Sequence, residues 1–285
     1  MTEKNVEKKV EFEKALTDFV DTLQKYISTP DGQWTIKGFI DVYKNIYTIS
    51  SDTKIISKIL EIHIFPELLK LSSDHGYDIV LAKHQNYYPD ISFVDKADNS
   101  IRFAVDFKTT YRDPKKPHLC NGFTLGSRGT YFKDRTSSKN IQFPYGSYTG
   151  HYCLGIIYDR VDEREIDETK IYDMDSYSSI SSVIGNFLFF VAEKWKIASD
   201  KSGSGNTANI GSIKRIEDIK NGRGVFSDLG ESVFDDYWMN YGQIEVLGKN
   251  GKPKKITSLK DFLEYRDQDT SLIVPMNNSK PIKDK

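Results

Sequence analysis

The chain has 285 residues, a formal net charge of −1 at pH 7 and a pI of about 6.5. Hydrophobic residues make up 38% of it and aromatic residues 13%, which excludes wholesale disorder and is enough for a real core. This length allows one large domain or two small ones. The balanced charge does not mark the chain as a nucleic-acid binder, although local patches matter more than totals.

Cysteine, histidine and apolar patterns exclude several kinds of protein. The two cysteines, Cys120 and Cys153, cannot form a Cys-x-x-Cys zinc site, and a disulfide framework is not expected. The five histidines show no His-Glu-x-x-His spacing. The first nine residues are charged without a following apolar segment, and the longest apolar run, 187–192, is too short to span a bilayer. We therefore expect a soluble, cytoplasmic protein.

A helix, a ribbon and a second helix are predicted first along the chain. Apolar residues from 10 to 27 recur at helical spacing. Residues 34–50 indicate strand, turn and strand, and such a small ribbon is expected to pack on another surface, with a second subunit as one candidate. Ser51 and Asp52 are the candidate N-cap residues for a helix that Pro66 disturbs. Glu61 lies in its apolar stretch, either on the solvent face or buried for a purpose such as metal binding.

The most informative pattern lies between residues 88 and 110. Residues 101–108 alternate with the period of a half-buried strand, which puts Asp106 and Lys108 together on one face. Residues 90–93 alternate as well, and the polar run 95–100 between the two segments predicts a hairpin. Registers that bury the apolar residues of both strands together also place Asp90 on the face of Asp106 and Lys108.

The two carboxylates and the lysine on this face are the kinds of groups that catalyse phosphodiester hydrolysis. Opposed residues on paired strands have Cβ atoms about 4.5–5.5 Å apart, so two carboxylates repel unless a proton or cation lies between them. Oxygen ligands suit Mg²⁺, and a neighbouring lysine can orient or deprotonate a water or stabilise a developing negative charge. The alternative is a solvated Asp-x-Lys pair on an exposed strand face, which is a common arrangement.

Three polar stretches are candidates for ligand contacts. Residues 83–88 include two side-chain amides, which can form hydrogen bonds to base edges or can belong to an ordinary solvent-exposed loop. Residues 124–140 form a basic, hydroxyl-rich stretch that suits phosphate contacts as well as a solvated loop. Residues 201–212 are rich in glycine but do not form a Walker loop. They are either a linker or a loop that brings its backbone and Asn206 close to a ligand.

The remaining elements are placed by composition. Residues 153–158 and 187–195 indicate buried strands, and the aromatic segment 234–241 is expected to pack. Ser258 is a candidate cap for a last helix that reaches Tyr265, and the tail from residue 277 is expected to fray. Because no internal repeat or clear linker is found, we expect one domain, 1–285, with appendages.

With these residues in view, the chain resembles the EcoRV family of type II restriction endonucleases, within the PD-(D/E)xK nuclease superfamily. The resemblance runs from about residue 34 to residue 241. Six stretches carry it, in order and at matching spacing: 51–54, 84–90, 104–110, 123–126, 138–141 and 203–212.

The resemblance implies an α/β (α+β) fold, with a mixed central β-sheet, flanking helices and a restriction-endonuclease-like core at 51–241. It also implies a small dimerisation ribbon at 34–50, and it leaves 242–285 as a C-terminal extension without an assigned role. The implied activity is that of a homodimeric, Mg²⁺-dependent endonuclease, with Mn²⁺ as a possible substitute, that cuts duplex DNA at GATATC to blunt ends. A cognate DNA methyltransferase in the same cell is implied as a functional partner.

The resemblance also assigns residues. Asp90 and Asp106 match metal-binding carboxylates, Glu61 matches a further acidic residue near the metal, and Lys108 matches the catalytic lysine. The residues that match DNA-contacting positions are Gly203, Ser204, Gly205, Asn206 and Thr207 in a major-groove recognition loop, Gln85 and Asn86 in a minor-groove loop, and Lys54, Thr110, Thr124 and Lys139.

Two other functions are compatible with the same fold. One is a DNA-binding protein without catalytic activity, although every acidic and basic position of the motif is present. The other is a structure-specific repair nuclease, against which the loop at 203–212 argues.

Overall fold

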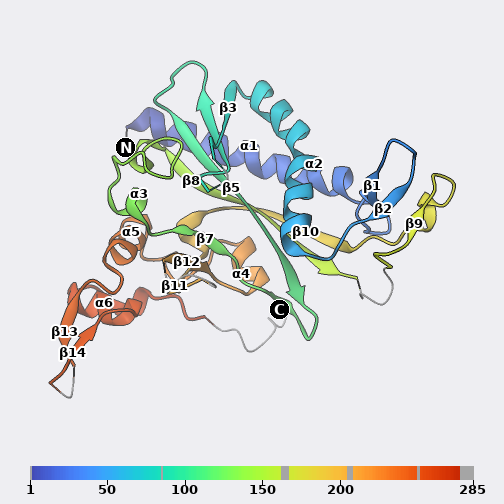
Figure 1. Cartoon of the computed structure of the whole chain (residues 1–285). Coiled ribbons are helices and arrows are strands. Elements are labelled where there is room, and N and C mark those ends of the chain that lie inside the picture. Colours follow the sequence, from blue (N-terminus) through green and yellow to red (C-terminus); the bar gives the residue numbers. More distant parts are fainter. Residues whose placement is uncertain (1, 85, 162–166, 204–207, 249–250, 277–285) are drawn as a thin grey trace, which may run out of the picture.

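The computed structural model describes residues 2–84, 86–161, 167–203, 208–248 and 251–276 (Figure 1). Its centre is a sheet in which five strands follow the order β10-β8-β5-β4-β3, with β6 paired to β5. Strands β5 and β8 run parallel, and the other neighbours are antiparallel, so the predicted mixed sheet is confirmed. The strands are β3 (Tyr77–Leu81), β4 (Ile91–Asp95), β5 (Arg102–Asp113), β6 (Lys116–Cys120), β8 (Gly150–Arg160) and β10 (Ile184–Glu193).

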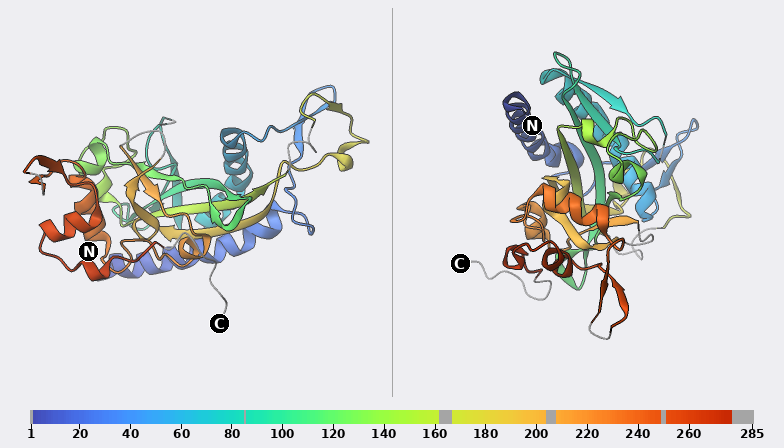
Figure 2. Two further views of the ribbon diagram at one scale, coloured as in Figure 1. Left: turned by 90° about the horizontal axis from the view of Figure 1, so that it is seen from below. Right: turned by 90° about the vertical axis from the view of Figure 1, so that its left-hand side faces the viewer.

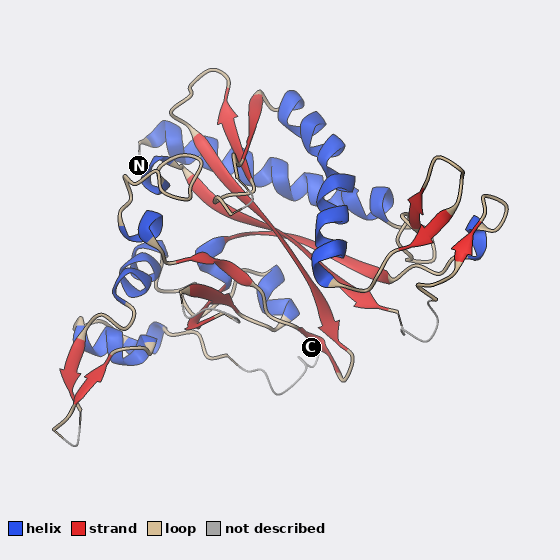
Figure 3. Ribbon diagram, viewed as in Figure 1, coloured by secondary structure: helices blue, strands red, loops and turns tan. Residues whose placement is uncertain are grey.

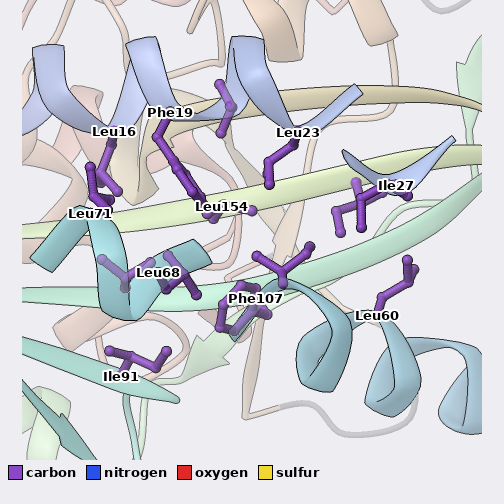
Figure 4. Packing of buried hydrophobic residues seen from close by; sticks show 14 of the residues in the cluster. Leu16, Phe19, Leu23, Ile27, Leu60, Leu68, Leu71, Ile91, Phe107 and Leu154 are labelled. Atoms are coloured by element: carbon purple, nitrogen blue, oxygen red, sulfur yellow. The ribbon is translucent and has the colours of Figure 1, made fainter. Parts of the chain in front are cut away.

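Two long helices cover one face of this sheet, α1 (Glu3–Ile27) and α2 (Thr53–Asp74). The predicted first helix is confirmed and begins earlier, at Glu3, because Thr2 caps it by accepting a hydrogen bond from the amide of Asn5. Its buried residues recur every three or four positions and pack on the sheet, with the Phe12 ring stacked on Phe103 at 4.1 Å between centroids. Figure 4 shows the same face of α1 in contact with side chains of α2 and of the strands.

Helix α2 does not break at its proline. Of the two predicted cap residues, Ser51 and Asp52, Asp52 caps the helix by accepting hydrogen bonds from the amides of Lys54 and Ile55. The predicted disturbance at Pro66 is wrong, because the helix continues through it. Pro66 lies on the exposed side, while Ile64 and Leu68 on either side of it are fully buried. Burial of the apolar stripe therefore outweighs the backbone hydrogen bond that proline cannot donate.

A second apolar cluster covers the opposite face of the sheet. It includes a three-stranded sheet in the order β11-β12-β7 and the short helices that follow (Figure 3). Because this cluster lies over β5, the prediction that β5 is half-buried is wrong, and both of its faces are buried. An internal strand that pairs in parallel is commonly covered on both sides. The elements are β7 (Thr124–Ser127), β11 (Ala198–Ser202), β12 (Asn209–Ser212), α3 (Thr130–Lys133), α4 (Ile216–Lys220) and α5 (Glu231–Asn240).

Two small sheets project at opposite ends of the molecule (Figure 2, left). At one end the predicted ribbon is confirmed as β1 (Gly38–Ile40) and β2 (Ile46–Thr48), and β9 (Ile171–Tyr172) adds a third strand. At the other end lie the hairpin β13 (Glu245–Leu247) and β14 (Pro253–Lys255) and the helix α6 (Leu259–Tyr265). Ser258 caps α6 as predicted. Among the described residues, the helices include none with the length and apolar character needed to cross a bilayer.

Candidate active site

The predicted hairpin between β4 and β5 forms, and its register sets the site. Ile91 pairs with Val105 and Ser92 with Ala104, so the next position along the ladder brings Asp90 opposite Asp106. The Asp90 amide donates to Oδ1 of Asp106 at 3.1 Å, and the Phe107 amide donates to Oδ2 of Asp90 at 2.8 Å. Each carboxylate is therefore bonded to the backbone of the strand that carries the other.

Lys108 completes a buried charged group on this face. Its Nζ lies 2.8 Å from Oδ2 of Asp106, and the side chains of Lys108 and Asp106 are 17% and 7% exposed. Burial alone would lower the pKa of Lys108, but the charges of Asp106 and Asp90 outweigh burial and the pKa is raised. Lys108 is therefore a charged, paired lysine at neutral pH, and the alternative of a solvated Asp-x-Lys pair is wrong.

The surroundings of Asp90 disfavour its anionic form. Burial and, after it, the charge of Asp106 raise the pKa of Asp90 to about 6. The nearby charge of Lys108 and the Phe107 amide act in the opposite direction. Asp90 and Asp106 repel each other when both are ionised. A hard cation bound between the two carboxylates would remove this repulsion.

Asp90 and Lys108 open onto a cavity of about 840 Å³. Its walls come from the start of α2, the end of β3, the middle of β5 and the start of β7. The lining residues that bear on the chemistry are Lys54, Lys58, Glu61, His84, Asp90, Lys108, Thr109 and Thr124. Acidic, basic and hydroxyl groups thus converge from segments that are far apart in the sequence.

Glu61 lies on the cavity wall, partly exposed, and not in contact with the carboxylate pair. Its Oε1 lies 2.8 Å from Nζ of Lys58, and its negative charge is the smallest of the influences named for Asp90. In the described part of the chain, no three His, Cys, Asp or Glu side chains are close enough together to hold a metal ion. The structure therefore brings Asp90 and Asp106 together and leaves Glu61 across the cavity.

The predicted DNA-contacting residues divide into four groups. Lys54 and Thr124 line the cavity, and Gly203 lies beside Thr124, since a Cβ on Gly203 would stand 2.8 Å from Cγ2 of Thr124. Thr110 is only 3% exposed and its hydroxyl donates to the carbonyl of Asn121, so its neighbour Thr109 reaches the cavity instead. Asn86 and Lys139 are exposed and lie outside the residues that line the cavity. Gln85, Ser204, Gly205, Asn206 and Thr207 lie outside the described residues.

Sequence reasoning did not single out His84, Thr109 or Lys194 as site residues. His84 and Thr109 line the cavity. Lys194 is buried, and burial lowers its pKa to about 8 although the charge of Asp106 acts in the opposite direction. A lysine inside the apolar run 187–195 was the available signal for that position.

Comparisons with known proteins identify a matching family and a similar sequence. A family model described as restriction endonuclease EcoRV matches residues 30–267. A type II restriction enzyme, EcoRV from Escherichia coli, is 34% identical over 235 residues, which cover 82% of this chain and 92% of that protein.

Proposed function

The chain belongs to the EcoRV family of type II restriction endonucleases, and on that premise we propose that Asp90, Asp106 and Lys108 form its DNA-cleaving centre. Membership makes the chain a site-specific deoxyribonuclease with DNA as its substrate. The observation that carries the proposal is the buried group of two opposed carboxylates and one paired lysine at the edge of a large cavity.

Asp90 and Asp106 are the residues proposed to hold the divalent cation on which this family generally depends, and we propose Mg²⁺, with Mn²⁺ as a substitute. Their oxygen atoms suit a hard ion, and such an ion would offset the burial and the charge of Asp106 that together raise the pKa of Asp90. When bound, the ion would polarise the scissile phosphate and lower the pKa of a bound water. Glu61 is proposed as a further acidic residue of this cavity that acts from its other wall.

Lys108 is proposed to stabilise the negative charge that develops on the phosphate during attack by water. Its raised pKa keeps it protonated, so in this state it donates hydrogen bonds and does not accept a proton. The ion pair with Asp106 fixes its position before the substrate arrives. In the overall reaction, water adds to phosphorus, the P–O bond to the leaving 3′ oxygen breaks, and a 5′ phosphate results.

The DNA is proposed to enter the cavity between α2 and the β7 edge. Lys54 and Thr124 are placed to contact phosphates there, and Gly203 begins the proposed recognition loop directly beside Thr124. We propose GATATC as the site, cut in its centre to blunt ends, with the amides at 85 and 86 in the minor groove and Asn206 on base edges in the major groove.

The test is a digest of a sequenced plasmid with purified protein, in Mg²⁺ and in EDTA, followed by sequencing of the fragment ends. Blunt ends within GATATC that form only with Mg²⁺ are expected. Ends at another palindrome would contradict the proposed site and keep the chemistry. Absence of cleavage with any divalent ion would contradict the proposed function.

A homodimer is proposed because a palindrome has the two-fold symmetry of a dimer. The ribbon supports this, since Phe39, Ile40, Val42 and Tyr43 expose large apolar side chains that a monomer would leave in water. Sedimentation at micromolar concentration is expected to give twice the mass of the 32.7 kDa chain. A cognate DNA methyltransferase and a cytoplasmic location belong to the same proposal, because host DNA carrying the site would need protection.

A further inference from the structure

Lys194 is a buried cation without a hydrogen-bonding partner. Its side chain follows β10, at the first position of the short 3₁₀ helix Lys194–Ile197, and the residue is 2% exposed. Within the described ranges, its Nζ has no hydrogen-bond partner. Burying an ammonium group in this way is costly unless other interactions compensate, so its presence calls for a physical reason.

Aromatic rings provide part of the compensation. The Nζ of Lys194 lies over three rings, 4.8 Å from the centroid of Tyr88, 5.3 Å from Phe132 and 5.4 Å from Tyr145. We call this surround the aromatic recess. Gly126 closes it, because a Cβ there would stand 3.3 Å from Nζ. The recess therefore fits an ammonium closely and attracts it through the ring faces.

The recess is built around the residue that leads into the carboxylate pair. Tyr88 precedes Asp90 by two positions, and its ring stacks on Tyr131 and Tyr145, with centroids 5.5 and 5.8 Å apart. Its hydroxyl lies 2.9 Å from Nδ1 of His151. Tyr131, Tyr145 and His151 therefore hold the ring of Tyr88 in place, and Lys194 adds a charged contact to its face.

Lys194 also lies on the face of the sheet that carries Asp106. Asp106 pairs with Cys153 of β8, and Cys153 pairs with Ala192 of β10, two positions before Lys194. Burial lowers the pKa of Lys194 to about 8, and the charge of Asp106 is the largest influence that raises it. The two charges are thus coupled through the interior, without a direct ion pair.

We propose that Lys194 is a positioning residue of the cleavage centre, whose ammonium holds the Tyr88 ring, and with it Asp90, and adds positive charge on the face of the sheet that carries Asp106. The proposal rests on the proposed function of Asp90 and Asp106. An apolar side chain of equal length would fill the recess without the cost of a buried charge. On this proposal the lysine costs stability and contributes geometry and charge to the site.

The test compares Lys194→Met with wild type in three measurements: single-turnover cleavage at saturating DNA and Mg²⁺, DNA affinity without metal, and thermal unfolding. We expect the cleavage rate to fall about 10- to 100-fold, as for other residues that support metal ligands from behind. We expect unchanged DNA affinity and an equal or higher melting temperature. Lys196→Met is the matched control, because Lys196 pairs with Glu193 at 2.8 Å and is not among the contacts of Tyr88 described above. Its cleavage rate should equal that of wild type.

Each outcome separates this inference from the proposed function. If wild type does not cleave, the proposed function fails. If wild type and Lys194→Met cleave at the same rate, Lys194 has no part in the site and this inference is overturned. A destabilised or unfolded Lys194→Met would make Lys194 a packing residue and would overturn it as well.

Discussion

Replacing Asp90 by asparagine should stabilise the metal-free protein and abolish its proposed activity. The substitution removes the anion that burial and Asp106 disfavour, and the amide oxygen of the new side chain can still accept the hydrogen bond from Phe107. The pKa of Asp90 is raised from 3.8 to about 6. That displacement corresponds to about 3 kcal/mol, and because Asp90 is partly exposed at the cavity we expect about 2 kcal/mol.

The pH dependence of the difference follows from the direction of the shift. Between pH 3.8 and about 6 the folded wild type binds more protons than the unfolded chain, so its stability falls as the pH rises. The asparagine variant lacks this loss. The difference between the two proteins should therefore be complete above about pH 6 and should vanish as the pH falls towards 4.

Urea unfolding in EDTA, followed by tryptophan fluorescence at pH 8, 6 and 4.5, measures this difference. Added Mg²⁺ should stabilise the wild type and have little effect on Asp90→Asn, because binding to the folded state alone shifts the equilibrium. If Asp90→Asn is less stable than wild type at pH 8 in EDTA, the two carboxylates do not repel each other and the reasoning is refuted.

Three further predictions concern other parts of the molecule. Lys108→Met should lower the stability in EDTA by about 3 kcal/mol, opposite in sign to Asp90→Asn, because it leaves the buried Asp106 and the partly exposed Asp90 without their cation; equal stability in urea would refute this. Val42→Asp should give monomers in sedimentation with little change in stability, since Val42 is 89% exposed; persistence of a dimer would exclude the ribbon as the interface. Gly155→Ala should cost about 3 kcal/mol, because its Cβ would overlap the Phe190 ring, and a wild-type unfolding curve would contradict this.

The carboxylate pair could be predicted from sequence because strand periodicity is strict. Only one parity of pairing buries the apolar residues of both strands, and that parity brings Asp90 opposite Asp106. The helix at the N-terminus, the ribbon and the caps at Asp52 and Ser258 follow from equally local rules. These features depend on residues that are neighbours in the chain.

Features that depend on distant segments could not be predicted in this way. The burial of Asp106 and Lys108 results from the second apolar cluster, whose members come mainly from residues beyond 120. The aromatic recess brings together Tyr88 and Lys194, which are more than a hundred residues apart in the sequence. No local sequence pattern predicts such a contact. The acceptor that holds the Thr110 hydroxyl, the carbonyl of Asn121, likewise comes from a segment beyond β5.

Asp106 is proposed to belong to the cleavage centre and not to the DNA-binding surface. The most direct test measures single-turnover cleavage of a duplex containing GATATC, and the affinity for that duplex without metal, for wild type and Asp106→Ala. We predict that wild type cleaves only with a divalent ion, and that Asp106→Ala binds the duplex but does not cut it. Robust Mg²⁺-dependent cleavage by Asp106→Ala would contradict the account.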